Sequence, residues 1–373
     1  MSIFKEYDIG IGRKVVRETL RIKRDIVGAF DKLKFRQIQK RYDKQWPAQL
    51  TLTSGAKSTS KKIAIFVLYQ PEGLRCSIYD TCKHLSDNGY GVLIVSNCPL
   101  TPQDKRKLST HVFHICERPN YGYDAGAYRD GAKLLPHLGL RPSHVVLLND
   151  SIWFPLLRSN DRLSQLENQN SGFGGLVRKT KAKEDKKAGQ ETAGFIEAYF
   201  YHANLSTKNS LEDFVTHWND LPLTVGRQGL RESRISQSYL KANDPLTALV
   251  SRTRFLTAVA TLSNEELRKV LEYGAYPVAE LRTAGQKLLQ KASDNVWRED
   301  VLRHVETTVN RYPFYGAFIY ASENQFSLGF LKRTRTPLFD ETRRAYLRAV
   351  SAGDLPTPSE TVLAEIESLV TKH

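Results

Sequence analysis

The chain has 373 residues, of which 40% are hydrophobic and 10% aromatic, enough apolar material for one large or two ordinary folded domains and too much for a disordered chain. The formal charge of +15 predicts an anionic partner: a nucleic acid, an acidic membrane surface or a phosphorylated substrate. The four cysteines have neither the short paired spacing of a zinc site nor the density of a disulfide scaffold. We find no secretory leader and no apolar run of about 18 residues that could span a membrane, so we expect a cytoplasmic protein.

Residues 1–50 are predicted to form a basic amphipathic helix. Residues 13–44 contain twelve Lys and Arg against four Asp and Glu, and apolar residues recur among them at helical spacing. This pattern is typical of a helix that lies on the anionic inner surface of a cell membrane. The same apolar stripe could instead pack on the protein's own core. The polar, non-periodic residues 51–62 that follow are predicted to be a linker.

The next part of the chain alternates between apolar strands and amphipathic helices. Uninterrupted apolar strands joined by helices predict a mostly parallel sheet that is covered by helices on both faces. Ligands bind such sheets beyond the carboxyl ends of the strands, where Tyr69, Asn97 and Asn149-Asp150-Ser151 are expected to meet. The predicted strands are 63–69, 91–96, 112–116 and 145–148, and the predicted helices are 77–88, 101–110 and 125–135.

Beyond residue 151 the alternation is less regular. Residues 172–177 and 194–202 are predicted to be strands, and the charged residues 179–191 between them a loop. A helix over 229–240 would carry Glu232 in its first turn. The expected organisation is therefore an α/β domain over residues 63–258 and a mainly helical region over residues 259–373.

Two acids in the first half of the predicted domain are candidates for metal or ligand binding. Asp150 would project into the crevice, where a carboxylate could hold a divalent cation against phosphates, although an Asp that caps the following turn is the alternative. Asp124 begins a predicted helix, where capping is the common role of Asp. The neighbouring Gly122 and Gly126 favour a second role, because glycines allow the backbone to approach a nucleotide closely.

Glu232 has two interpretations as well. It could act as a general base in the crevice, or it could be a first-turn acid that the helix dipole stabilises. The sequence contains no Walker loop, no GxGxxG, no HExxH and no GxSxG, so the most familiar signatures of kinases, dehydrogenases, zinc hydrolases and esterases are missing.

Taken together, the pattern resembles the rhamnan synthesis protein F family of bacterial glycosyltransferases. The resemblance covers about residues 60–245. The segments that carry it are IAIFVLY (63–69), VLIVSN (92–97), RPNYGYDAGAYRDG (118–131), VVLLNDSIWFPL (145–156), GFIEAYFYHANLS (194–206), LEDFVTHW (211–218) and RESRISQSYL (231–240).

The resemblance implies a GT-A-like fold that transfers a sugar, with rhamnose suggested by the family name, from a nucleoside diphosphate donor. The acceptor would be a lipid-linked glycan, a growing cell-surface polysaccharide of the O-antigen or rhamnan type, and the enzyme would lie peripherally at the inner face of the membrane. Asp150 would hold Mg2+ or Mn2+, and Glu232 would deprotonate the acceptor. Arg129, Arg178 or Lys179 could assist the departing diphosphate. The implied donor-binding residues are Tyr69, Asn97, Asn120, Asp124 and Asn149.

The sequence departs from the usual Asp-X-Asp metal motif, because Asn149-Asp150-Ser151 has one acid where two are common. This departure leaves open a non-catalytic subunit of a polysaccharide assembly complex that has the same fold. A nucleic-acid-binding protein is a third possibility that only the charge supports. It is not expected, because the strongest cluster of cations lies on the N-terminal helix and not on the folded domain.

Overall fold

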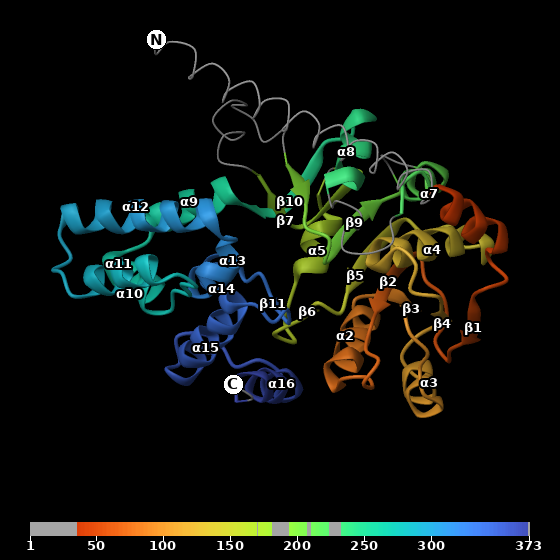
Figure 1. Ribbon diagram of the computed structural model, residues 1–373, viewed down its shortest axis with the longest axis horizontal. Coiled ribbons are helices and arrows are strands. Elements are labelled where there is room, and N and C mark those ends of the chain that lie inside the picture. Colours follow the sequence, from red (N-terminus) through yellow and green to blue (C-terminus); the bar gives the residue numbers. More distant parts are fainter. Residues whose placement is uncertain (1–35, 170, 181–193, 207–209, 224–232, 372–373) are drawn as a thin grey trace, which may run out of the picture.

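The computed structural model describes residues 36–169, 171–180, 194–206, 210–223 and 233–371. Its centre is a nine-stranded sheet with the order β1-β4-β3-β2-β5-β9-β7-β10 and with β8 paired to β7 (Figure 1). The strands of this sheet are β1 (Thr51–Ser54), β2 (Lys62–Leu68), β3 (Tyr90–Ser96), β4 (His114–Glu117), β5 (His144–Asn149), β7 (Phe173–Lys179), β8 (Phe195–Ile196), β9 (Phe200–Asn204) and β10 (Leu246–Ser251).

Most strands of the sheet point the same way. β4, β3, β2 and β5 are parallel neighbours, and β7 is parallel to β10. β9 lies between β5 and β7 and is antiparallel to both, so β5 and β7 have the same direction. The carboxyl ends of these strands therefore lie along one edge of the sheet. The predicted α/β class, with a mostly parallel sheet between helices, is confirmed.

Helices cover both faces of the sheet. Successive apolar side chains of β2 point to opposite faces, so each face needs a covering layer. Ile63, Ile65 and Val67 pack against the first set of helices, and Ala64, Phe66 and Leu68 belong to the core on the other face. The first set comprises α4 (Tyr123–His137), α7 (Leu211–Asn219) and α8 (Ser233–Lys241). The other face of the sheet is covered by α2 (Cys76–Asp87), α5 (Arg162–Glu167) and the C-terminal helices, and α3 (Pro102–Ser109) packs beside β4.

Helix α4 lies unusually close to the sheet. A Cβ atom on Gly131 would lie 2.5 Å from Cγ2 of Ile65, which no real side chain could accept. The helix is preceded by Gly122, whose φ of 76° lies in the left-handed region that glycine adopts without strain. These two glycines bring the amino end of α4, and with it Asp124, to the carboxyl edge of the sheet.

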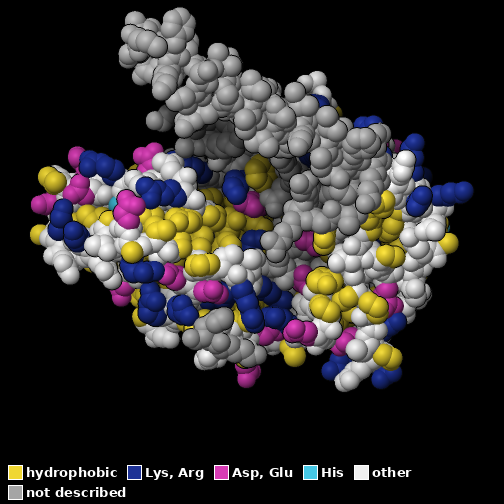
Figure 2. All heavy atoms as spheres, viewed as in Figure 1, with side chains coloured by type: hydrophobic (Ala, Val, Ile, Leu, Met, Phe, Trp, Pro, Cys, Tyr) yellow, Lys and Arg dark blue, Asp and Glu magenta, His cyan; other side chains and the backbone are white. Residues whose placement is uncertain are grey.

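The C-terminal region is helical, as predicted, and it shares the core on the second face of the sheet. It also sends a short strand back to the sheet edge, because β11 (Leu331–Lys332) pairs with β6 (Ile152–Trp153) directly after β5. Figure 2 shows a broad hydrophobic area over this region, at the left of the view. Its helices are α9 (Arg252–Thr261), α10 (Asn264–Glu272), α11 (Ala279–Leu289), α12 (Asn295–Arg311), α13 (Phe314–Ala317), α14 (Ile319–Phe326), α15 (Pro337–Ser351) and α16 (Glu360–Val370).

The predicted linker over residues 51–62 was wrong in its first part. Thr51–Ser54 form β1, which pairs with β4 in antiparallel register. An edge strand of this kind is exposed and polar, so it lacks the apolar pattern that identifies buried strands. The boundary predicted between residues 258 and 259 falls inside α9.

The predicted N-terminal membrane helix lies largely outside the described residues. Residues 36–45 are helical, and Tyr42 is only 7% exposed, because this turn of helix packs on the protein itself. For these residues the alternative of packing on the protein's own core is the one observed. No helix in the described part of the chain is long and apolar enough to cross a membrane.

Candidate functional site

Asp150 is fixed at the carboxyl edge between β2 and β5. Its backbone N–H donates to the carbonyl of Val67 at 3.1 Å, and its carboxylate Oδ2 accepts from the backbone N–H of Tyr69 at 3.0 Å. Tyr69 itself is about half exposed. The Asp150 carboxylate therefore binds a backbone N–H, as a capping Asp does. That N–H belongs to the end of the neighbouring strand β2 and not to the turn that follows Asp150.

A second carboxylate lies next to Asp150. The side-chain amide of the buried Asn149 donates to Oδ2 of Asp124 at 2.9 Å, which ties the end of β5 to the amino end of α4. The other side of the same amide accepts from the hydroxyl of Ser151 at 2.6 Å. Asn149 thus holds Asp124 in place beside Asp150.

The electrostatics of the two acids show that they share one environment. Burial, and then the charge of Asp150, raises the pKa of Asp124 to about 6, while Lys332 and Arg118 act in the opposite direction. Burial also raises the pKa of Asp150. Two partly desolvated carboxylates disfavour each other's ionised form, and a cation placed between them would reverse this effect.

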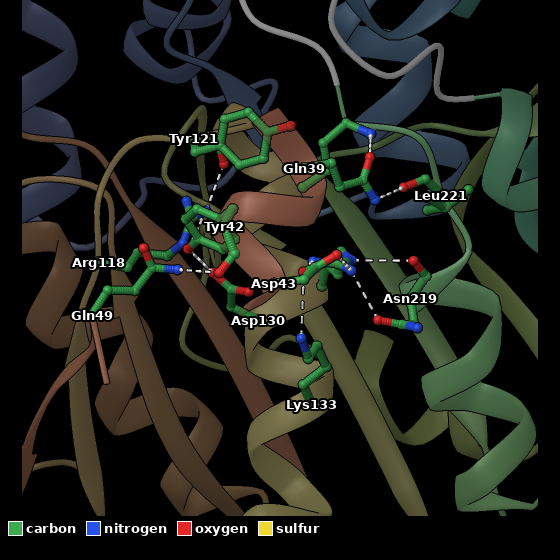
Figure 3. Close-up of polar contacts among 12 residues, drawn as sticks. Gln39, Tyr42, Asp43, Gln49, Arg118, Tyr121, Asp130, Lys133, Asn219 and Leu221 are labelled. Carbon is green, nitrogen blue, oxygen red and sulfur yellow. Dashed lines mark hydrogen bonds and ion pairs between the residues drawn. The ribbon is translucent and has the colours of Figure 1, made fainter. Parts of the chain in front are cut away.

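Arg118, which follows β4, connects Asp124's loop to the end of β3. Its guanidinium donates to the side-chain carbonyl of Asn97, to the backbone carbonyl of Tyr121 and to the carboxylate of Asp130. Figure 3 shows Tyr42 of the N-terminal helical turn next to this pair, with its hydroxyl donating to the same Asp130 carboxylate. The buried Nδ2 of Asn97 has no partner among the described residues.

The C-terminal region contributes two cations to this edge. Lys332 of β11 contacts the hydroxyl of Ser151 at 3.3 Å, and the backbone N–H of Arg333 donates to the carbonyl of Ser151 at 2.8 Å. The Arg333 side chain is 8% exposed and lies over the ring of Trp153. Burial lowers the pKa of Arg333 to about 10, although the carboxylates of Glu365 and Asp150 oppose this shift.

Arg333 is only partly satisfied where it lies. Nη2 donates to the hydroxyl of Ser77 and is 3.8 Å from the carboxylate of Glu365. Nε and Nη1 are buried and have no hydrogen-bond partner in the described part of the chain. Arg75 is close enough to act on Asp150 and Arg333 electrostatically. The edge therefore has cationic groups with unused donors beside a pair of carboxylates, which is a suitable surface for an anionic ligand.

Residues 92–230 match the family model of rhamnan synthesis protein F. This match confirms the resemblance seen in the sequence, and the matched segment contains Asn97, Asn120, Asp124, Asn149 and Asp150.

Individual proteins with similarity include the uncharacterized protein y4gN of Sinorhizobium fredii (strain NBRC 101917 / NGR234), which is 29% identical over 263 residues, or 70% of this chain and 67% of that protein. A solved structure of the mannosyltransferase PcManGT from Pyrobaculum calidifontis, in complex with GDP-Man and Mn2+, is 11% identical and covers 86% of this chain and 94% of its own, with a TM-score of 0.34. The mannosyltransferase Ktr4p from S. cerevisiae is 10% identical over 46% of this chain and 64% of its own, with a TM-score of 0.26.

The structure brings most of the predicted site residues to one edge of the sheet. Asp124, Asn149 and Asp150 are in one hydrogen-bonded or electrostatic group with the backbone of Tyr69, and Asn97 joins it through Arg118. Asn120 is exposed, and no described residue hydrogen-bonds its side chain. Glu232 lies outside the described residues.

The cations expected to assist the departing diphosphate are placed differently from that hypothesis. The guanidinium of Arg129 is 1% exposed and bound to Asp43 at 2.6 Å and to Asn219, and Arg178 donates to the carbonyl of Leu246. The cations at the carboxylate pair are instead Lys332 and Arg333. The sequence shows a basic segment there, FLKRTR over residues 330–335, but nothing in it indicates that β11 returns to β6.

Proposed function

We propose that this chain is a glycosyltransferase that moves a sugar from a nucleoside diphosphate donor to a growing bacterial cell-surface polysaccharide of the O-antigen or rhamnan type. Rhamnose is the sugar that the description of the matching family suggests. The observation that carries the proposal is the pairing of Asp124 and Asp150 beside the buried, partly unpartnered Arg333. A metal-bound diphosphate requires a pair of carboxylates that holds the metal ion and, next to it, a basic side chain that binds the phosphates.

The residues present fit a divalent cation bound together with a nucleotide. In the described residues no group of three or more His, Cys, Asp and Glu could hold a metal by itself. Mg2+ is commonly held by one or two carboxylates, with substrate phosphates and water completing the coordination. Asp150 and Asp124 would supply these carboxylates for Mg2+ or Mn2+. The bound cation would neutralise charge on the departing diphosphate.

The remaining donors of the edge suit the rest of the nucleotide. The free Nε and Nη1 of Arg333 can donate to diphosphate oxygens, and Lys332 adds positive charge from the same segment. The unused amide nitrogen of Asn97 and the exposed ring of Tyr69 lie at the ends of the two neighbouring strands. We assign donor binding to these residues together with Asn120, Asp124 and Asn149.

Glycosyl transfer needs a base as well as a leaving-group cation. The transition state develops positive charge on the sugar and negative charge on the diphosphate, while the acceptor hydroxyl loses its proton. We assign the base role to Glu232 on the strength of the RESRIS segment alone. In this mechanism the chain binds and orients the donor at the carboxylate edge, and Glu232 accepts the proton of the acceptor.

The acceptor in this proposal is a lipid-linked glycan at the inner face of the membrane, and residues 13–44 would bring the enzyme there. Residues 36–45 pack on the protein through Tyr42, so the membrane contact is assigned to the part before them. Deleting residues 1–35 is expected to abolish co-sedimentation with anionic vesicles and to leave binding of nucleotide unchanged. Undiminished vesicle binding by the truncated chain would contradict the membrane part of the proposal.

A screen of nucleoside diphosphate sugars for release of free nucleotide, with Mg2+ or Mn2+, tests the function. We expect release from at least one donor by the wild-type chain and a loss of about a hundredfold or more in Asp150→Asn and in Asp124→Asn, because removing electrostatic stabilisation of a developing charge has effects of this size. Asp87→Asn is the matched control, since Asp87 lies in an exposed pair with Lys83 on α2.

The screen also separates the alternative functions. Nucleotide binding without release from any donor would favour the non-catalytic subunit. That interpretation rests on the single acid of Asn149-Asp150-Ser151, and the hydrogen bond from Asn149 to Asp124 supports Asp124 as the second acid of our proposal. In Figure 2 the cationic and acidic side chains of the described residues are intermixed on the face shown, which does not favour a nucleic acid there.

A further inference from the structure

A second cavity lies on the same edge of the sheet as the carboxylate pair. Its volume is about 250 Å³, and it is formed between the carboxyl ends of β7 and β10 and the turn from α12 to α13. The polar and aromatic side chains that line it include Arg178, Lys179, Glu197, Arg252, Asn310 and Tyr315. None of these residues belongs to the site described above.

Two arginines of this cavity, Arg252 and Arg311, are already paired with carboxylates, which distinguishes it from the carboxylate edge around Asp150. Lys179 is 4.0 Å from Glu197, and Arg252 is 3.6 Å from Glu306 and also donates to Asn310. Arg311 is paired with Glu280 at 3.2 Å. A strongly anionic ligand would have to compete with these carboxylates, so the lining favours an uncharged ligand with many hydrogen-bonding groups.

Glu197 is a buried acid in the lining of the cavity. It is 7% exposed and follows β8, and its backbone N–H donates to the carbonyl of Val177, which fixes its position. Its described partners are distant, since the hydroxyl of Tyr315 is 3.3 Å away and the ammonium of Lys179 is 4.0 Å away. A carboxylate has about four lone-pair positions, so Glu197 can accept further hydrogen bonds from a ligand's hydroxyl groups.

One layer of aromatic rings separates this cavity from the carboxylate pair. The ammonium of Lys332, which contacts Ser151, lies 3.9 Å from the centre of the Tyr199 ring. The Tyr199 ring in turn lies 5.9 Å from the ring of Tyr315, which lines the cavity. A ligand in the cavity and a ligand at the carboxylates would therefore lie on the two sides of this layer, at the same edge of the sheet.

We propose that this cavity binds an uncharged sugar residue of the glycan acceptor, an inference that rests on the function proposed above. Glu197 and Asn310 would accept or donate hydrogen bonds to its hydroxyl groups, and the ring of Tyr315 would contact its apolar face. The volume lies just below the range of about 300 to 1,000 Å³ that accommodates drug-sized ligands, so it fits one sugar residue and not a long glycan.

Titration of the full-length protein with a panel of methyl glycosides, followed by saturation-transfer NMR, tests the assignment. The panel contains the methyl glycosides of rhamnose, mannose, galactose, glucose and N-acetylglucosamine. We expect wild-type protein to bind at least one of them, and Glu197→Gln to weaken that binding by about tenfold or more, since a hydrogen bond to a charged group is lost. Asn310→Ala, at an exposed position that cannot unfold the core, should weaken it by about three- to tenfold.

The matched control is Glu212→Gln, which makes the same substitution in an exposed pair with Arg141 on α7. It should bind the glycoside as wild type does, and the melting temperature of each variant shows whether it is folded. Failure of every glycoside to bind wild-type protein would overturn the cavity assignment, as would equal binding by wild type, Glu197→Gln and Asn310→Ala.

The same panel separates this inference from the proposed function. Release of nucleotide in the donor screen, together with no glycoside binding, would retain the transferase and reject this cavity as its acceptor site. Glycoside binding that depends on Glu197, without nucleotide release from any donor, would retain a sugar-binding cavity and reject the transferase. A raised acceptor KM with unchanged nucleotide affinity in Glu197→Gln is the result expected when both hold.

Discussion

The buried pair of Arg118 and Asp130 offers a sharp test of how the N-terminal helical turn supports the site. Nε of Arg118 lies 2.6 Å from Oδ2 of Asp130, and both side chains are completely buried. In Asp130→Asn the guanidinium of Arg118 would keep its charge. It would lose Asp130, its only ion-pair partner among the described residues. Breaking a buried pair by removing one charge costs about 3 to 5 kcal/mol, because the remaining charge stays desolvated.

Thermal unfolding measures this cost. An unfolding entropy of about 2.1 cal/mol/K per residue amounts to about 0.8 kcal/mol/K for a chain of 373 residues, so Asp130→Asn should melt about 4 °C or more below wild type. Tyr42→Phe removes the hydrogen bond that Tyr42 donates to Asp130 and the one that it accepts from Arg118 but leaves the ion pair, so we expect a smaller loss of about 1 to 2 kcal/mol. Asp87→Asn, in an exposed pair with Lys83, should change the stability by less than about 1 kcal/mol.

The order of these three variants is the decisive result. If Asp130→Asn were as stable as Asp87→Asn, the buried pair would not stabilise the fold and the reasoning would be refuted. Because Arg118 also holds Asn97 and the carbonyl of Tyr121, Asp130→Asn should in addition weaken nucleotide binding at temperatures where it is folded. Unchanged nucleotide affinity in the folded variant would show that Arg118 keeps its place without Asp130.

Three further outcomes are expected. Arg333→Met keeps the packing on Trp153 but removes the unpartnered donors. The affinity for a nucleoside diphosphate, measured by calorimetry, should therefore fall by about ten- to a hundredfold. Arg335→Met, at an exposed position, is the control and should leave this affinity unchanged. Glu232→Gln should bind donor normally but lose transfer, and unaltered turnover would exclude Glu232 as the base. Burial, and then the charge of His144, lowers the pKa of His202 to about 3. Below about pH 6.5 the unfolded chain therefore binds a proton at His202 that the folded chain excludes. The free energy of unfolding should fall by about 1.4 kcal/mol per pH unit as the pH drops from 6.5 towards 4. In urea unfolding, His202→Gln should show a shallower fall over the same range.

The parts of the fold that the sequence predicts are those whose pattern is local. β2, β3 and β5 are uninterrupted apolar runs, and such runs occur in strands that are buried on both faces. β1 was missed because its Thr and Ser residues lie at an exposed edge, where pairing with β4 and not burial holds the strand.

The arrangement of cations could not be predicted in the same way. Arg129, one of the three cations that the sequence suggests, is bound by Asp43 of the helical residues 36–45. Lys332 reaches Ser151 from 181 positions away in the sequence, through the pairing of two-residue strands that have no periodicity to detect. Contacts of this kind depend on the final packing of the C-terminal helices, which no local pattern records.

The same distinction accounts for the apparent lack of a second acid. A sequence motif such as Asp-X-Asp places both carboxylates on one strand end, so its absence at Asn149-Asp150-Ser151 suggests an incomplete site. In the structure the position before Asp150 is an amide that donates to Asp124, and the second carboxylate comes from the amino end of α4. The close packing of Gly131 on β2 and the left-handed Gly122 set the place of that helix end. Glycines of the NYGYDAGAYRDG segment therefore help to bring Asp124 to Asp150.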